Sequence, residues 1–257
     1  MNPITIVALI LNLFFLESIL KNPHYVVEIG LVLFLISSFV TLKNSKFGFF
    51  SLKSLKSLIL PLLFLIGTIL SLLLLGSHFL RQVLIFFYIF TFGIFQISLI
   101  DIVKKFSGKK DKEEKVKMHI RESFLVIATY FLITTGVLGF YFYLSLPFWQ
   151  VFLAIFVVSW ALMYYTLWRA GLIFANTWLY VLILGLVMVE VLWAISFWPV
   201  NFWVSAMVLV IIFYIFRGLV WMYLQKAFVP RLLKEYLTLG VVFLIILLAT
   251  SRWTINF

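Results

Sequence analysis

The chain has 257 residues, of which 65% are hydrophobic and only 11% are charged. A soluble domain carries about 25% charged residues, and no soluble fold of this length has an interior large enough to bury so much Leu, Ile, Val and Phe. A mean hydropathy of +1.19 therefore excludes a soluble globule and predicts that lipid surrounds the chain. The absence of cysteine excludes disulfides, thiolate metal sites and a cysteine nucleophile.

The first apolar run, residues 3–20, lacks both the basic n-region and the small-residue cleavage site of a secretory signal. We interpret it as a retained spanning segment. It is short and contains Asn12 and Glu17. If it only dips into the bilayer, the number of spans falls to eight and the N-terminus lies outside.

Long apolar runs of this kind continue along the whole chain. A helix needs about 20 apolar residues to cross a hydrocarbon core about 30 Å thick. The runs are continuous rather than alternating, so they predict helices and not a barrel. The predicted fold class is all-α: a polytopic transmembrane helix bundle of about nine spanning helices, forming a single integral membrane domain over residues 1–257 with no soluble domain. The runs are 3–20, 25–42, 57–75, 82–100, 124–144, 149–168, 172–198, 200–219 and 236–251.

The seventh run, 172–198, is longer than the others. At 1.5 Å per residue it would measure about 40 Å as one helix, so we expect it to tilt, kink or protrude.

Basic residues follow the alternation of the loops. If successive loops lie on opposite sides, all but three of the 20 Lys and Arg fall on one side. Cytoplasmic loops collect such residues, which predicts a cytoplasmic (inner) membrane location with the N-terminus cytoplasmic and the C-terminus external. The same rule accounts for the net charge of +11, so nucleic-acid binding is not needed to explain it. No folded domain remains that could present a basic surface to nucleic acid. The three exceptions are Lys21, Arg81 and Arg252.

Two lysine-rich loops stand out on the predicted cytoplasmic side. Segment 43–56 mixes lysines with phenylalanines, which is typical of a segment lying on a leaflet. Segment 101–122 has opposite charges at i,i+4 spacing, which suits a short solvated helix. We expect these loops to act as topology anchors or to bind anionic lipid headgroups. The predicted anchors are Lys43, Lys46, Lys53, Lys56, Lys104, Lys105, Lys109 and Lys110.

Glu190 is the clearest ionisable residue within a span. An ionisable group at the centre of a spanning helix costs about 2.5–3.5 kcal/mol on insertion scales, so it needs a partner or a purpose. On the predicted topology Glu190 lies about 12 Å below the external interface, at 1.5 Å per residue. Either it makes an interhelical hydrogen bond, or it belongs to a functional site.

Other ionisable residues lie at the same predicted external side, near the first two outer turns. One hypothesis is that the outer halves of several helices converge on a water-accessible site, with Glu28 or Glu190 opposite Arg81. The alternative is that each side chain reaches the interface separately. A zinc site would need two His and a carboxylate, but the spacing is not diagnostic, so we predict no metal. The candidate polar site consists of Glu17, His24, Glu28, His78, Arg81 and Glu190.

Milder polar residues inside the runs, such as Asn12 and Gln96, are expected to hydrogen-bond between helices. Gly67 and Ser71 have the small-xxx-small spacing of close helix packing.

No known catalytic or nucleotide-binding motif is present, so no cofactor and no catalytic residue is predicted. The best hypothesis is a transporter of a small solute or lipid, with its polar site in the outer half of the bundle. One alternative is a non-catalytic subunit or scaffold with a membrane-protein partner. A second is an embedded enzyme acting on a lipid headgroup, which is the least favoured. A transporter needs a passage that opens to both faces of the membrane. An enzyme needs its acid or base and Arg81 to line one cavity. A subunit should instead show a broad apolar side without a pocket.

Overall fold

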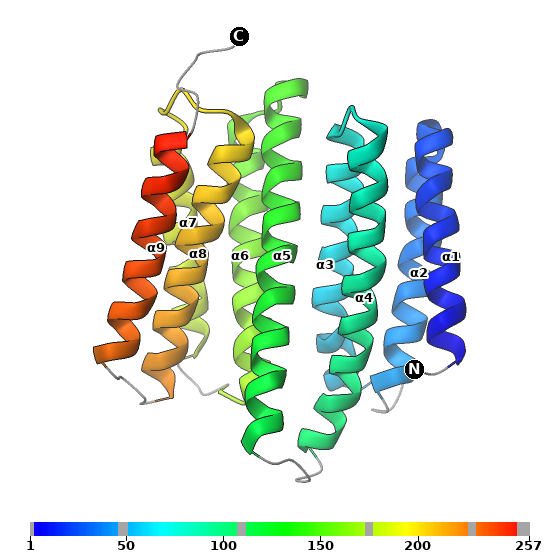
Figure 1. The fold of residues 1–257 in the computed structure, drawn as a ribbon, viewed down its shortest axis with the longest axis horizontal. Helices are drawn as coiled ribbons and strands as arrows, with labels where there is room; N and C mark the ends of the chain where they lie inside the picture. Colours follow the sequence, from blue (N-terminus) through cyan, green and yellow to red (C-terminus); the bar gives the residue numbers. More distant parts are fainter. Residues whose placement is uncertain (1–2, 46–50, 107–111, 173–176, 226–229, 251–257) are drawn as a thin grey trace. The chain divides into compact units, whose positions relative to one another are not determined.

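The computed structural model of the chain is built from α-helices, and the described part contains no strand (Figure 1). The structure describes residues 3–45, 51–106, 112–172, 177–225 and 230–250. A 3-10 turn, η1 (Pro23–Tyr25), joins the first two helices. The helices within these ranges are α1 (Pro3–Lys21), α2 (Val26–Ser45), α3 (Leu52–Leu74), α4 (His78–Phe106), α5 (Lys112–Leu144), α6 (Phe148–Ala170), α7 (Thr177–Ile195), α8 (Phe202–Leu224) and α9 (Pro230–Thr250).

These helices confirm the predicted all-α bundle of about nine helices. Eight of them, α1 to α8, are long and apolar enough to cross a membrane, as judged over the described residues. The first helix is one of the eight, with 19 residues. Large apolar side chains are exposed along most of them, as expected for helices that face lipid.

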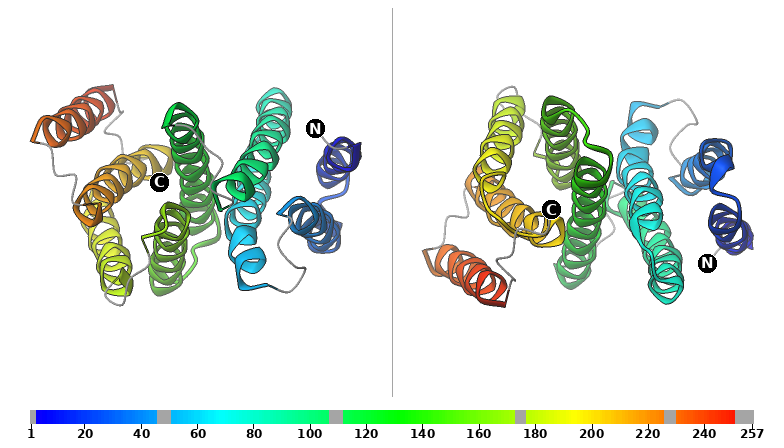
Figure 2. Two further views of the ribbon diagram at one scale, coloured as in Figure 1. Left: turned by 90° about the horizontal axis from the view of Figure 1, so that it is seen from below. Right: turned by 90° about the horizontal axis from the view of Figure 1, so that it is seen from above.

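The chain divides into two compact units, Met1–Ile133 and Thr134–Phe257. The first unit contains α1 to α4 and the first part of α5, and the second contains the rest of α5 and α6 to α9. In the first unit, α2 contacts α1, α3 and α4, while α4 also packs on α1 and α3. In the second unit, α7 packs on both α6 and α8, and α8 also contacts α9 (Figure 2). Whether the chain forms a single membrane domain stays a prediction.

A dense core fills the first unit between α1, α2, α3 and α4. Phe64 stacks on Tyr88 with ring centroids 5.4 Å apart, and Tyr88 stacks on Phe92 at 5.8 Å. Around this aromatic column lie the buried side chains of Leu16, Ile19, Leu33, Leu65, Leu72 and Ile85.

The small-xxx-small pair of α3 brings that helix very close to α5. A Cβ added to Gly67 would lie 2.9 Å from the backbone nitrogen of Ile133 and 3.0 Å from the Cβ of Leu132. One turn further on, the hydroxyl of Ser71 donates to the carbonyl of Leu132 at 3.0 Å. Glycine is therefore required at position 67, because any side chain would meet the facing backbone.

The second unit also contains a close approach of two helices. A Cβ added to Gly185 on α7 would lie 3.0 Å from the ring of Phe156 on α6. The buried face of α7 packs by apolar contact, through Val181, Leu184, Met188, Leu192 and Ile195.

The expected seventh run, 172–198, does not form one long helix. Helix α7 spans 19 residues, Thr177–Ile195, and residues 196–198 form turns. At 1.5 Å per residue it measures about 29 Å, which matches the hydrocarbon thickness. The tilt or protrusion expected for this run is therefore not needed.

The predicted loop 101–122 is instead largely helical. Helix α4 continues to Phe106 and α5 begins at Lys112, so these helices have 29 and 33 residues. They measure about 44 and 50 Å, which is longer than the hydrocarbon core, so they must tilt within it or extend beyond it. The pair Glu113 and Lys117 lies in α5, which confirms a helix there. Asp111 lies outside the described residues.

Candidate functional site

The predicted polar site has five of its six residues in the first unit. His24 in η1, Glu28 in the first turn of α2 and His78 at the start of α4 are exposed, whereas Glu17 in α1 is half-buried. Within the described residues these four side chains make no ion pair, and no group of three His, Asp or Glu could hold a metal ion.

Arg81 is the half-buried cation of this set. Its Nε donates to the carbonyl oxygen of Leu75 at 2.5 Å. Leu75 is the residue that caps the end of α3, so the guanidinium holds the turn between α3 and α4. The arginine thus has a local structural role and makes no ion pair with Glu28 within the described residues of the first unit, whereas its pairing with Glu190 stays a prediction.

Glu190 lies on the exposed side of α7 in the second unit. It is five residues before Ile195, where the helix ends, which is about 7.5 Å at 1.5 Å per residue. The described part of the chain offers its carboxyl group no hydrogen-bond or ion-pair partner. Intramembrane acids usually face the interior of a bundle, so an acid on the outward face is unusual.

Two layers of buried polar side chains join α1, α2 and α4 inside the first unit. In one layer, the amide oxygen of Asn12 accepts from Ser37 Oγ at 3.3 Å and from the hydroxyl of Tyr88 at 3.4 Å. All three side chains are fully buried. This layer therefore uses one residue from each of three helices.

The second layer lies seven residues earlier on α1, up to seven residues later on α2 and eight residues later on α4. Asn44 Nδ2 donates to Thr5 Oγ1 at 3.0 Å and to Gln96 Oε1 at 2.9 Å. Gln96 Nε2 donates in turn to Thr41 Oγ1 at 3.3 Å. Bonds from Asn12 and Gln96 to neighbouring helices confirm the prediction made for these two residues.

The repeat of the layers follows the heptad of packed helices. Thr5 and Asn12 are seven residues apart, and so are Ser37 and Asn44. Polar residues at such positions fix the register of packed helices, because a shifted helix would leave amides buried without partners. The layers thus specify how the α1–α2 hairpin sits on α4.

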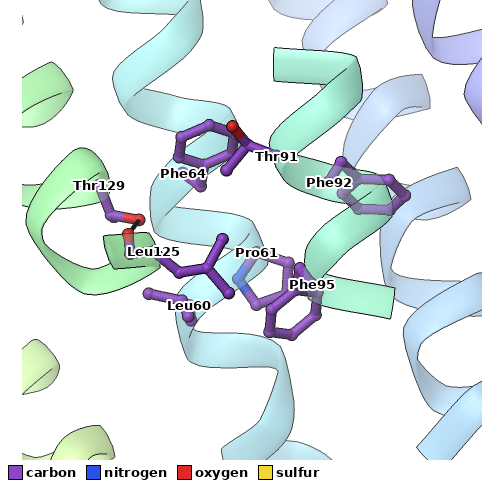
Figure 3. Close-up of a pocket in the computed structure, with 8 residues that line it drawn as sticks. All are labelled: Leu60, Pro61, Phe64, Thr91, Phe92, Phe95, Leu125 and Thr129. Atoms are coloured by element: carbon purple, nitrogen blue, oxygen red, sulfur yellow. Dashed lines mark hydrogen bonds between the residues drawn. The ribbon is translucent and has the colours of Figure 1, made fainter. Parts of the chain in front are cut away.

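A small pocket of about 10 Å³ lies between α3, α4 and α5 in the first unit (Figure 3). Pro61 and two threonines contribute to its lining, which is otherwise apolar. Thr129 Oγ1 donates to the carbonyl of Leu125 at 2.7 Å, whereas the buried Thr91 Oγ1 has no hydrogen-bond partner within the described chain. A cavity needs about 10–15 Å³ on this measure to hold a single water molecule, so this pocket is too small for a solute.

Two arginines are buried inside helices of the second unit. Arg169, in the last turn of α6, is 3% exposed, and Arg217, within α8, is 5% exposed. The guanidinium of Arg169 lies 5.8 Å from the ring centroid of Tyr165, which is a cation–π contact. The alternation of basic residues along the sequence assigned both arginines to the cytoplasmic side and did not predict their burial.

The predicted lysine anchors are only partly within the described residues. Lys43 is exposed near the end of α2, with its Nζ 5.8 Å from the ring centroid of Phe39. Lys53 and Lys56 lie in the first turns of α3 and not in a loop. Lys104 and Lys105 belong to α4, and their side chains are not described; Lys46, Lys109 and Lys110 lie outside the described residues.

The helices, their lengths and their lipid-facing side chains define a multi-pass helical membrane protein. A model of a family of proteins of unknown function, DUF5656, matches residues 41–250, so the chain belongs to that family. Helix α1 and most of α2 precede the matched region. No curated protein and no solved structure matches the chain.

Proposed function

We propose that this protein is a non-catalytic subunit of a membrane complex, located in the cytoplasmic membrane with its N-terminus inside. The observation that carries this proposal is the exposed carboxyl group of Glu190 on α7. A carboxyl facing lipid is costly, and a neighbouring protein that covers it removes that cost. The polar layers of the first unit support the same function, because their groups bond one another across packed helices.

The size of the protein in a native membrane extract tests this function. The chain has a mass of 30.0 kDa. We expect native mass spectrometry after mild solubilisation to find it at fixed stoichiometry with a different membrane protein. Single copies alone, combined with solute flux in reconstituted vesicles, would contradict the proposal.

A second candidate function is the transport of a small solute or lipid, favoured by the burial of Arg169 and Arg217. Charged side chains within spanning segments often mark pathways for ions or solutes. The two helices that carry them, α6 and α8, contact each other. Uptake into vesicles that contain the purified chain alone, lost in Arg169→Leu and Arg217→Leu, would establish this function over the first.

The proposed orientation has its own test. Because the chain has no cysteine, single cysteines at Ser51 and Ser77 report which side each position faces. These residues lie at opposite ends of α3. We expect a membrane-impermeant maleimide to label only Ser77→Cys in intact cells; labelling of Ser51→Cys alone would reverse the orientation.

A further inference from the structure

An apolar stripe with a single acid runs along the outward face of α7. Its members recur every three or four residues, so those within the helix lie on one side of it, and Phe197 continues the stripe in the turn that follows. All are exposed, and the opposite face of α7 packs on its neighbours within the unit. The stripe consists of Leu179, Ile183, Leu186, Glu190, Trp193 and Phe197.

The chemistry of this stripe restricts what can cover it. Apolar side chains alone would be satisfied by lipid, but the carboxyl group of Glu190 needs a hydrogen-bond donor or a cation. It has neither within the described chain. An occupant of the stripe must therefore bring a polar group to the depth of Glu190.

A second copy of the chain fits this requirement poorly. If two copies met symmetrically on this face, each Glu190 would face either another acid or an apolar side chain, because the stripe carries no basic residue. Like charges at an interface are repulsive. A different helix with a Lys or Arg in its outer half complements the carboxylate directly.

We infer that the α7 stripe is the docking surface for a transmembrane helix of a partner protein, which presents a Lys or Arg to Glu190. This inference rests on the proposed subunit function. The apolar residues of the stripe supply packing, and Glu190 selects the partner and fixes its register, as single polar residues do at other helix interfaces.

Photo-cross-linking in the native membrane tests the inference. A benzoylphenylalanine is placed at Leu186 of the full chain, one turn from Glu190. The matched control is Val157 on α6, which is exposed to the same extent (47% against 48%). Val157 lies nine residues from the start of α6, and Leu186 lies nine residues from the end of α7. We expect the probe at Leu186 to capture one transmembrane segment that contains Lys or Arg, and the probe at Val157 to capture lipid.

Variants of Glu190 then distinguish a specific contact from simple proximity. Glu190→Leu should lower the cross-link yield at Leu186 at least about tenfold, with Glu190→Gln intermediate. Glu190→Lys should restore the cross-link yield when the captured basic residue of the partner is replaced by Glu. Glu28→Leu, which changes an exposed acid at a helix end, should leave it unchanged.

The possible failures are distinguishable. If the protein purifies in a complex whose stability does not depend on Glu190, this docking surface is wrong although the subunit function stands. If Leu186 cross-links only to lipid, to another segment of its own chain or to a second copy, the inference is overturned. If no complex forms at all, the subunit function fails as well.

Discussion

The two units use different kinds of side chain at their helix contacts. In the first unit, α1, α2 and α4 meet through two layers of hydrogen-bonded amides and hydroxyls, with Asn44 bound to both Thr5 and Gln96. In the second unit, α7 meets its neighbours through apolar side chains and Gly185, while its acid lies on the outward face. Lipid gives both kinds of contact little hydrophobic driving force, so polar bonds and close packing must supply specificity. The first unit satisfies these polar groups internally, whereas the second presents Glu190 to its surroundings.

The close approach of α3 and α5 should be the most sensitive point of the first unit. Gly67→Ala places a methyl group within 3.0 Å of backbone and Cβ atoms of α5, which should lower the free energy of unfolding by about 1–3 kcal/mol. Thermal unfolding in detergent measures this loss. Gly93→Ala is the control, because an added Cβ there meets nothing within 4 Å and should be neutral or stabilising. Equal stability of the two variants would show that α3 and α5 do not pack this closely.

Removal of a polar layer should have a smaller effect. Asn44→Leu removes two interhelical bonds, and such bonds average about 0.6 kcal/mol, so we expect a loss of about 1 kcal/mol. A double-mutant cycle of Asn44→Leu with Gln96→Leu should give a coupling energy of about 0.5 kcal/mol or more. Strictly additive losses would contradict the second layer.

Two threonines of the pocket should respond with opposite signs. Thr91→Val removes a buried hydroxyl without a partner and should stabilise the chain by about 0.5–1 kcal/mol. Thr129→Val removes a hydroxyl that bonds a carbonyl of its own helix, so it should be neutral or slightly destabilising. Thermal unfolding of the two variants makes the comparison. Destabilisation by Thr91→Val would show that its hydroxyl binds something in the pocket.

Much of the fold could be predicted from the sequence, because hydropathy reports directly on lipid contact. The runs 25–42 and 149–168, for instance, correspond closely to α2 and α6. The ends were less predictable: α4 and α5 continue into a charged segment, since a helix with i,i+4 charge pairs needs no apolar residues in water. Hydropathy also placed the start of α3 five residues late, after Lys53 and Lys56, because this helix begins at its Ser51 cap and not at the first apolar run.

The polar residues were harder to predict, because their surroundings depend on which helix faces which. Asn12 and Gln96 were identified as interhelical residues, but their partners Ser37, Thr41 and Tyr88 were not. Small hydroxyls barely change the hydropathy of a run, so the only signal was the seven-residue spacing of Thr5 to Asn12 and Ser37 to Asn44. The outward side of Glu190 also depends on packing, since its helix is apolar all round.

Two variants, each measured in two assays, test the central claim that Glu190 faces a partner whereas the polar layers stabilise the chain itself. Glu190→Leu should leave the unfolding free energy of the purified chain within about 0.5 kcal/mol, because the residue is exposed, yet release the chain from its complex in native mass spectrometry. Asn44→Leu should do the reverse, lowering the unfolding temperature while the complex persists. A complex that survives Glu190→Leu, or a purified chain that unfolds readily with that substitution, would contradict the account.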